Sequence, residues 1–222
     1  LREYYFVGGM PESVMKFIET NDAIKVREVQ NNILYTYQKD ISKHVPTSES
    51  NRINMVWQSM PSQLVKENKK FIYGVTKPGG RAKDFEIAIQ WLMDAGLVYK
   101  AERVNEAKMP LKFYVDISGF KLFLLDCGLL GAMSETPPEK LLVAENGMEE
   151  SKGAFTENYV MSQLVATRDT SVFYYSNDAK LEIDFLIQHG GEIVPIEAKA
   201  EENLRAKSLS TFVASRPGMH GL

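Results

Sequence analysis

Hydrophobic residues recur at helical spacing through the first 45 residues of the chain. Pro11 suits the first turn of a helix, and an apolar period runs from Ser13 to Ile18. A second period runs from Ala23 to Ile41, with apolar side chains every three or four positions. The pattern predicts a helical segment over residues 1–45, which would form a first domain.

Three further helices are predicted in the next part of the chain. The polar, proline-containing stretch 45–50 is expected to connect them to the first segment. Phe85, Ala88 and Ile89 form an apolar stripe in the third of these helices and are expected to be core, and Gly96 suits its end. The three helices are expected at about residues 51–59, 62–68 and 81–95.

An alternating pattern of apolar and polar residues follows the third helix. Residues 97–104 alternate as a strand, and a second strand is expected at 121–125, after a turn around 117–119. Three helices and a hairpin of strands are the layout of a winged-helix domain. We therefore predict a winged-helix-like domain over residues 46–133.

Basic residues gather before the third helix and at its start, and they could contact nucleic-acid phosphates. The outward positions of that helix, however, carry Asp84, Glu86 and Asp94, and acidic groups would repel the phosphate backbone. A protein-interaction or packing role is therefore favoured for this domain, with weak nucleic-acid binding as the alternative. The basic residues are Lys66, Lys69, Lys70, Lys77, Arg81 and Lys83.

Two prolines within residues 134–140 mark the start of a third predicted domain, 134–222. It opens with a helix that holds Glu157, and the run His189-Gly190-Gly191 indicates a hairpin between its last two strands. The chain as a whole is predicted to be α+β or α/β, ending in a mixed sheet flanked by helices. That sheet could lack its last strand. Strands are expected at 171–175, 180–188 and 191–199, and a final helix at 204–213.

The last two predicted strands carry charged residues on alternate positions. Glu182 and Asp184 are expected on one face of their strand, and Glu197 and Lys199 on one face of the next. If these faces coincide, three carboxylates and one ammonium group converge. The apolar positions expected on the opposite face of the first strand are Leu181, Ile183, Phe185 and Ile187.

Glu157 is expected to lean toward the same place from the preceding helix. It stands at helical spacing from Val160 and Met161, which should face the core. A solvated glutamate would instead share the side of Asn158 or Ser162. A helix and two strands would thus deliver four carboxylates and one lysine to one region.

Carboxylates held together need compensation, because two unit charges about 4 Å apart repel by roughly 4 kcal/mol at an effective dielectric of about 20. Oxygen ligands suit a hard cation, Mg²⁺ first and Mn²⁺ next. Glu157, Asp184 and Glu197 are the predicted metal ligands and catalytic residues, with Glu182 as a supporting carboxylate. Lys199 would orient a water or stabilise phosphoryl charge. The alternative is that these charges only solvate the wet face of the strands.

The order Glu, Asp, Glu-x-Lys on a helix and two strands resembles the PD-(D/E)XK, or restriction-endonuclease-like, nuclease fold. Gly153-Ala-Phe-Thr-Glu-Asn-Tyr-Val160, Glu182-Ile-Asp-Phe-Leu186 and Pro195-Ile-Glu-Ala-Lys199 resemble, more closely, the C-terminal part of a prokaryotic AAA-type P-loop ATPase family. That part is known as domain of unknown function 4143. The resemblance takes in further segments, the first of them Gly8-Gly-Met-Pro-Glu12. It implies a nuclease-like fold, an N-terminal segment that serves as the ATPase lid, and an ATPase domain upstream.

Composition adds context but no chemistry. Apolar content of 44%, charged content of 25% and a net charge of -3 are ordinary for a globular protein and give no overall attraction to nucleic acid. The single cysteine, Cys127, suits a reducing cytoplasm, and no membrane span or signal peptide is recognisable. The chain has no GxxxxGK[ST] loop and does not begin with Met, so we expect a fragment whose ATP-binding domain is missing.

Two functions remain open from the sequence. The first is a Mg²⁺-dependent nuclease that cleaves phosphodiester bonds in nucleic acid. The second is a non-catalytic interaction or regulatory module attached to an AAA-type ATPase.

Overall fold

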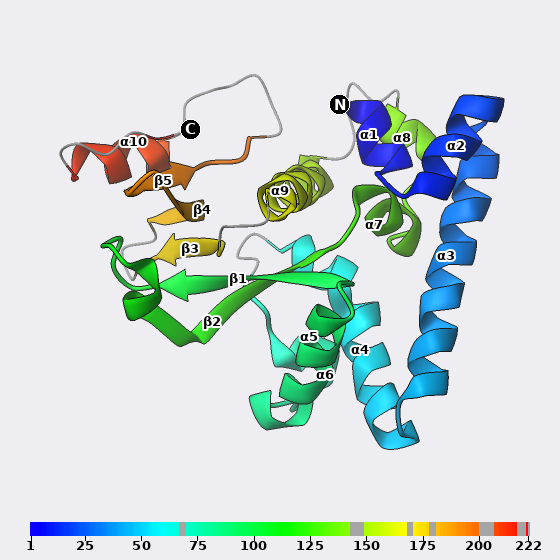
Figure 1. The fold of residues 1–222 in the computed structure, drawn as a ribbon, viewed down its shortest axis with the longest axis horizontal. Coiled ribbons are helices and arrows are strands. Elements are labelled where there is room, and N and C mark those ends of the chain that lie inside the picture. Colours follow the sequence, from blue (N-terminus) through cyan, green and yellow to red (C-terminus); the bar gives the residue numbers. More distant parts are fainter. Residues whose placement is uncertain are drawn as a thin grey trace.

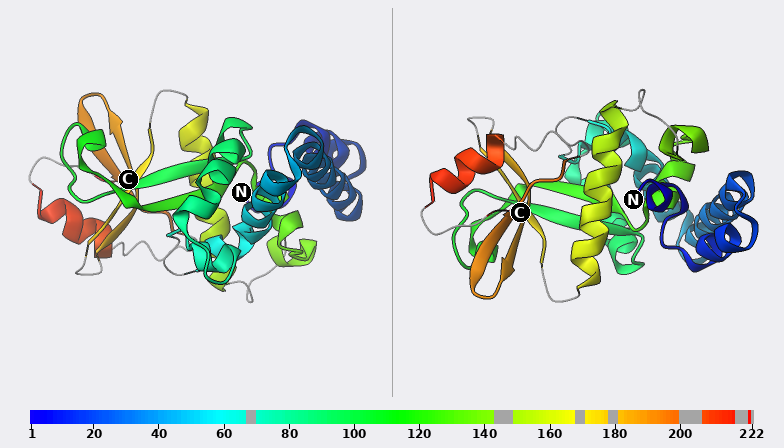
Figure 2. Two further views of the ribbon diagram at one scale, coloured as in Figure 1. Left: turned by 90° about the horizontal axis from the view of Figure 1, so that it is seen from below. Right: turned by 90° about the horizontal axis from the view of Figure 1, so that it is seen from above.

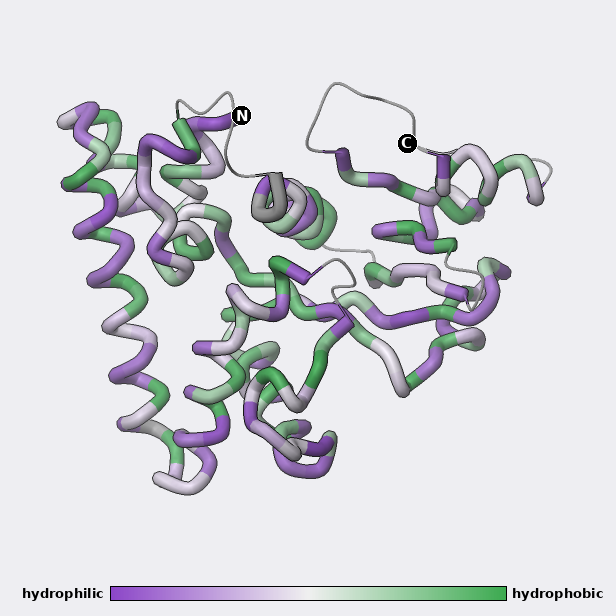
Figure 3. Tube along the Cα trace, turned by 180° about the vertical axis from the view of Figure 1, so that it is seen from behind, coloured by the Kyte–Doolittle hydropathy of each residue, from purple (hydrophilic) through white to green (hydrophobic). Residues whose placement is uncertain are grey.

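The computed structural model describes residues 1–66, 70–142, 149–167, 171–177, 181–199, 207–216 and 221. Within them, helices surround a mixed sheet of five strands, so the fold is α+β as predicted (Figure 1). In Figure 3, hydrophobic positions recur between hydrophilic ones along the long N-terminal helices, as the helical period in the sequence requires.

The N-terminal segment is helical, which confirms the first prediction. Pro11 begins the second helix, and Asp22 caps the third by accepting hydrogen bonds from the amides of Ile24 and Lys25. Gly8 lies between the first two helices with a positive φ of 74°. The helices are α1 (Arg2–Val7), α2 (Pro11–Thr20) and α3 (Ala23–His44).

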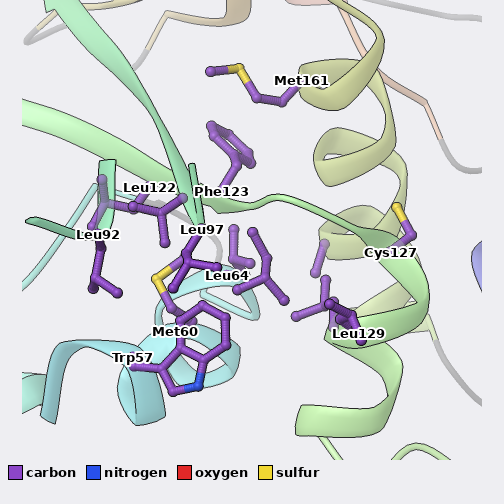
Figure 4. Packing of buried hydrophobic residues seen from close by; sticks show 14 of the residues in the cluster. Trp57, Met60, Leu64, Leu92, Leu97, Leu122, Phe123, Cys127, Leu129 and Met161 are labelled. Atoms are coloured by element: carbon purple, nitrogen blue, oxygen red, sulfur yellow. The ribbon is translucent and has the colours of Figure 1, made fainter. Parts of the chain in front are cut away.

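One continuous helix, α4 (Thr47–Leu64), replaces the two helices predicted at 51–59 and 62–68. Pro61 lies inside it, so the expected break before residue 62 was wrong. A proline in a helix costs about 3 kcal/mol. Met60 and Leu64 on either side of it are fully buried, and this packing outweighs the local penalty (Figure 4). Residues 67 and 68 lie outside the described chain.

The third predicted helix is confirmed as α6 (Ala82–Asp94), and it follows a single turn, α5 (Tyr73–Thr76). Its buried side chains are those of the predicted apolar stripe. Gly96 follows it with a φ of 70°, which suits the predicted glycine end.

The hairpin after α6 is confirmed, but its turn is not where the sequence indicated. β1 (Val98–Val104) pairs antiparallel with β2 (Val115–Leu124), and residues 105–114 connect them through the short 3₁₀ helix η1 (Leu111–Tyr114). The predicted turn at 117–119 is instead a bulge inside β2. Glu102 pairs with Phe120 and the next residue, Arg103, pairs with Asp116, so three residues loop out of the ladder.

A single sheet joins this hairpin to the last part of the chain. Its order is β2-β1-β3-β4-β5, with β1 and β3 parallel and the other neighbouring strands antiparallel. The sheet therefore crosses the boundary predicted between residues 133 and 134, although the division into three domains stays a prediction. The added strands are β3 (Phe173–Ser176), β4 (Glu182–His189) and β5 (Glu192–Ile196).

Helices cover the two faces of the sheet. Figure 2 shows α9 lying across one face, while α10 packs at the other end of the molecule beside β4 and β5. Phe212 of α10 belongs to a small core with Phe173 and Ile183, whereas Met161 of α9 belongs to the main core. The remaining helices are α7 (Cys127–Met133), α8 (Pro138–Leu142), α9 (Glu149–Ala166) and α10 (Lys207–Ala214).

The apolar residues of β4 do not share one face, so that prediction was wrong. Ile183 packs in the small core under α10, but Phe185 packs in the main core against Phe123. The cause is a β-bulge: Phe173 pairs with Leu186 and Tyr175 with Ile183, which sets three steps of β4 against two of β3. A β-bulge changes the face of the sheet toward which the side chains beyond it point. This bulge lies at Asp184.

Candidate functional site

Helix α9 brings Glu157 into the interior, as its apolar spacing predicted. The residue is 6% exposed. Asn158 beside it is fully buried too, so the expectation that it faces solvent was wrong. Its side-chain oxygen accepts from the Leu124 amide (2.7 Å), and its amide nitrogen donates to the Leu124 carbonyl (3.0 Å). α9 contacts both α7 and the sheet, so more than one of its sides is buried.

A lysine that the sequence reasoning missed lies between the helix and β4. Lys121, on β2, is 1% exposed. Its ammonium nitrogen lies 2.6 Å from Oε1 of Glu182 and 3.9 Å from Oε2 of Glu157. It also lies 4.8 Å from the centre of the Tyr174 ring, within the range of a cation–π interaction. Lys121 is the one charged residue within the otherwise apolar stretch Phe120–Leu125, and this sequence feature could have revealed it.

Asp184 links the start of β4 to the residues that follow the end of β5. Its Oδ2 accepts a hydrogen bond of 2.9 Å from the amide of Ala198, just beyond the last residue of β5. The bond holds residues 197–199 beside the β4 bulge. This local geometry is the reason that Glu197 and Lys199 lie near Asp184.

Glu197 and Lys199 form an ion pair at this point, with 2.6 Å between Oε1 and Nζ. The glutamate side chain is only 7% exposed and the lysine side chain 41%. The second oxygen of Glu197, Oε2, is buried and has no hydrogen-bond partner among the described residues. Burial raises the pKa of the Glu197 carboxyl, although the hydrogen bond from Lys199 opposes the shift.

The predicted residues act on one another as a single charged cluster. Burial works to lower the pKa of Lys121, but Glu157, Glu182 and Asp184 outweigh it and raise that pKa. The pKa of Lys199 is raised in the same way, with Glu197, Asp184 and Glu157 opposing its burial. The structure thus brings together all five residues expected from the sequence and adds Lys121. We call these six residues the carboxylate–lysine cluster.

Part of the cluster fits a divalent cation. Within the described residues, no group of three or more His, Cys, Asp or Glu is arranged to hold a metal ion. Mg²⁺, however, is commonly bound by one or two carboxylates together with water and substrate phosphates. Asp184 and the unpartnered oxygen of buried Glu197 fit such a two-carboxylate site, because an unpartnered buried acceptor is costly unless something binds it.

Family comparisons divide the chain into two regions. Residues 1–140 match the model of a Domain of unknown function (DUF8612). The chain belongs to the DUF8612 family. Residues 152–220 match a second Domain of unknown function (DUF4143), which confirms the resemblance to that domain over these residues. No curated protein and no solved structure matches the chain.

The two family regions meet inside the cluster. Lys121 belongs to the DUF8612 region, whereas its partners Glu157 and Glu182 belong to the DUF4143 region. The other two carboxylates and Lys199 also lie in the DUF4143 region. A site residue from outside that region could not have been found from its motifs.

The basic residues predicted to approach nucleic acid lie in the DUF8612 region, away from the cluster in the chain. Lys77, Arg81 and Lys83 are exposed around the start of α6, and Lys66 and Lys70 are half-buried; Lys69 lies outside the described residues. Glu86 and Asp94 on α6 are exposed as well, so the acidic outward face expected of this helix is present. Among the helices of the described residues, none has the length and apolarity to cross a membrane.

Proposed function

We propose that the DUF4143 region is a nuclease-like domain that holds Mg²⁺ or Mn²⁺ at the carboxylate–lysine cluster and cleaves phosphodiester bonds in nucleic acid. The observation that supports it most is the buried Glu197 carboxylate, whose Oε2 has no hydrogen-bond partner among the described residues. Asp184 stands next to it, held by the Ala198 amide. The PD-(D/E)XK resemblance of these residues supports the same reading.

The residues take distinct roles in this proposal. Asp184 and Glu197 would hold the cation; Glu157, the third ligand expected from the sequence, faces Lys121 instead. When bound, the cation polarises a phosphoryl oxygen and lowers the pKa of its water. Lys199 is the more exposed member of the Glu197–Lys199 pair. Its ammonium group can therefore turn toward a substrate phosphate and stabilise its charge. Glu182 supports the cluster through its ion pair with Lys121.

The parent protein is proposed to be an AAA-type ATPase of the cytoplasm, with ATP bound upstream of the present chain. This step rests on the family resemblance of the DUF4143 region. In that arrangement α1–α3 act as a lid on the motor, and the module after them, with its three helices and hairpin, packs the nuclease-like part onto it.

A non-catalytic interaction or regulatory module is the second candidate, and Lys121 is the observation that favours it. Lys121 and Lys199 already compensate part of the carboxylate charge, so the cluster has a purely structural use as a salt-bridge network. The acidic surface of α6 also lacks the charge expected of a DNA-reading helix.

Nicking of supercoiled plasmid in the presence of Mg²⁺ or Mn²⁺ separates the two candidates. We expect the wild-type chain to nick DNA and Lys199→Ala to be slower by about 100-fold or more, the usual cost of losing one group that stabilises transition-state charge. Lys100→Ala is the matched control, because Lys100 also pairs with a glutamate two residues away, at 2.9 Å from Glu102.

The control is expected to retain wild-type activity. Nicking that persists in Lys199→Ala would belong to another site or to a contaminant. A wild-type chain that is inactive with both metal ions, although folded, would leave the non-catalytic module as the function.

A further inference from the structure

Lys121 is the most deeply buried charge of the carboxylate–lysine cluster and the only one of its six residues from the DUF8612 region. Its side chain is 1% exposed, on a strand whose neighbours Leu122 and Phe123 are core residues. An ammonium group at such a place is costly unless close counter-ions replace its hydration. Glu182, at 2.6 Å, is the direct counter-ion, and Glu157, at 3.9 Å, is the more distant one.

The net charge of the cluster limits the number of cations that it can bind. Taken by themselves, the four carboxylates and two ammonium groups leave an excess of two negative charges. One divalent cation balances this excess, whereas two would leave an equal positive excess in a largely buried place. Removal of the Lys121 charge alone would raise the negative excess to three.

The position of Lys121 separates the carboxylates into two sets. Its contact with Glu182 is short, so that carboxylate is already engaged. Glu197 is engaged differently, because Oε1 binds Lys199 while Oε2 is buried with no hydrogen-bond partner among the described residues. In enzymes that use two metal ions, the two lie about 3.5–4 Å apart. Because Lys121 binds Glu182, that carboxylate is not free to serve as a ligand of a second cation.

We propose that Lys121 is a built-in cation that engages Glu182 and limits the cluster to one divalent metal ion. The inference rests on the proposed metal site and adds to it the number of metal ions and the residue that sets this number. It also makes the site composite, since the DUF8612 region supplies the cation and the DUF4143 region supplies the ligands. Lys121 acts here as a positioning residue.

The number of Mn²⁺ ions bound per chain, counted by electron paramagnetic resonance, tests the proposal. We expect one ion for the wild-type chain, two for Lys121→Met, and one again for Lys121→Met combined with Glu182→Gln, which removes the charge and its partner together. Lys121→Arg keeps the charge and is expected to bind one. A single ion in Lys121→Met, at unchanged affinity, would overturn the inference and leave the proposed function intact.

Two other outcomes count against both proposals. Binding to Lys121→Met but not to the wild-type chain would contradict the proposed function and also the inferred limit of one ion, because Lys121 would then exclude metal altogether. The absence of Mn²⁺ from both chains would overturn both.

A measurement on the wild-type chain decides the matter if Lys121→Met does not fold. The ¹⁵N signal of the Lys121 ammonium group, assigned by its absence in Lys121→Arg, should be protected from exchange and should persist in saturating Mg²⁺. The Lys199 signal is expected to shift. Loss of the protected Lys121 signal on addition of Mg²⁺ would show that the metal displaces the lysine from Glu182, and the inference would be wrong.

Discussion

The buried side chain of Asn158 holds α9, and with it Glu157, against the edge of the sheet. β2 is an edge strand of the described sheet, and Asn158 takes the place of a neighbouring strand by pairing with both backbone groups of Leu124. The residue before it, Glu157, is thereby fixed in the cluster. Sequence spacing predicted the inward Glu157 but not Asn158, because helical periodicity alone does not show that a helix is buried on several sides.

Replacement of Asn158 by Ala should destabilise the chain strongly. Two buried backbone groups of Leu124 would lose their partners at about 1–3 kcal/mol each, so we expect a loss of about 2–6 kcal/mol in the free energy of unfolding. Ser162→Ala is the control on the same helix, since Ser162 donates only to the Tyr159 carbonyl. Urea denaturation of both variants measures the difference, and equal midpoints would contradict this role of Asn158.

Cys127 is predicted to be inert in the folded chain. Burial raises the pKa of its thiol to about 12. At pH 8 the thiolate fraction is then on the order of 10⁻⁴, against roughly a quarter for a free thiol. We expect labelling by a thiol-specific disulfide reagent to be slower by about three orders of magnitude in the native chain than in the guanidinium-unfolded chain. The rate should rise about tenfold with each pH unit below 12, as the thiolate fraction does, and rapid labelling of native protein at pH 8 would refute this.

At the scale of elements, local patterns located helices and strands but not their interruptions. The period from Ala23 to Ile41 became α3, and the His189-Gly190-Gly191 signal became the β4–β5 turn. The proline of α4 and the two bulges were missed. Each of these features has a local cost in free energy that tertiary packing or strand pairing outweighs. The residues that supply this packing are distant in the chain, so a local pattern does not reveal them.

The β4 bulge matters most for the candidate site. Strict alternation would put Ile183 and Phe185 on one face, but they pack in different cores. Glu182 and Asp184 both act on the charge of Lys121 all the same, so the two carboxylates remain neighbours although the predicted alternation of β4 was wrong.

The connection between α1 and α2 gives a test at the same scale. Gly8 has a φ of 74°, and an added Cβ would lie 2.6 Å from Oδ2 of Asp126, the residue that caps α7 and accepts from the Gly9 amide. Gly8→Ala should cost about 1–2 kcal/mol for the backbone and a further 1–3 kcal/mol for the disturbed Asp126 hydrogen bonds. Thermal unfolding measures this cost.

Gly79→Ala is the matched control for that substitution. Its φ is 75°, and nothing lies within 4 Å of an added Cβ, so only the backbone cost applies. If the two variants unfold at the same temperature, the contact between Gly8 and Asp126 does not stabilise the junction of α1 and α7.

At the scale of the whole molecule, one sheet and one main core join the two family regions. β1 pairs with β3 across the regions, and core residues run from Phe6 to Phe185. The composition and periodicity could predict the α+β class and the order of the elements. They could not predict that Lys121 would reach the acidic residues, because this depends on the pairing of β1 with β3, in which Glu102 lies opposite Phe173, about 70 residues further along the chain.

The central claim is that this assembled cluster holds a divalent metal ion through Asp184 and Glu197. Calorimetric titration of Mn²⁺ into the wild-type chain and into Glu197→Gln tests it most directly. We expect one bound ion in the wild-type chain and at least about tenfold weaker binding in the variant, a difference of about 1.4 kcal/mol or more. Equal binding by the two chains, or no binding to a folded wild-type chain, would contradict it.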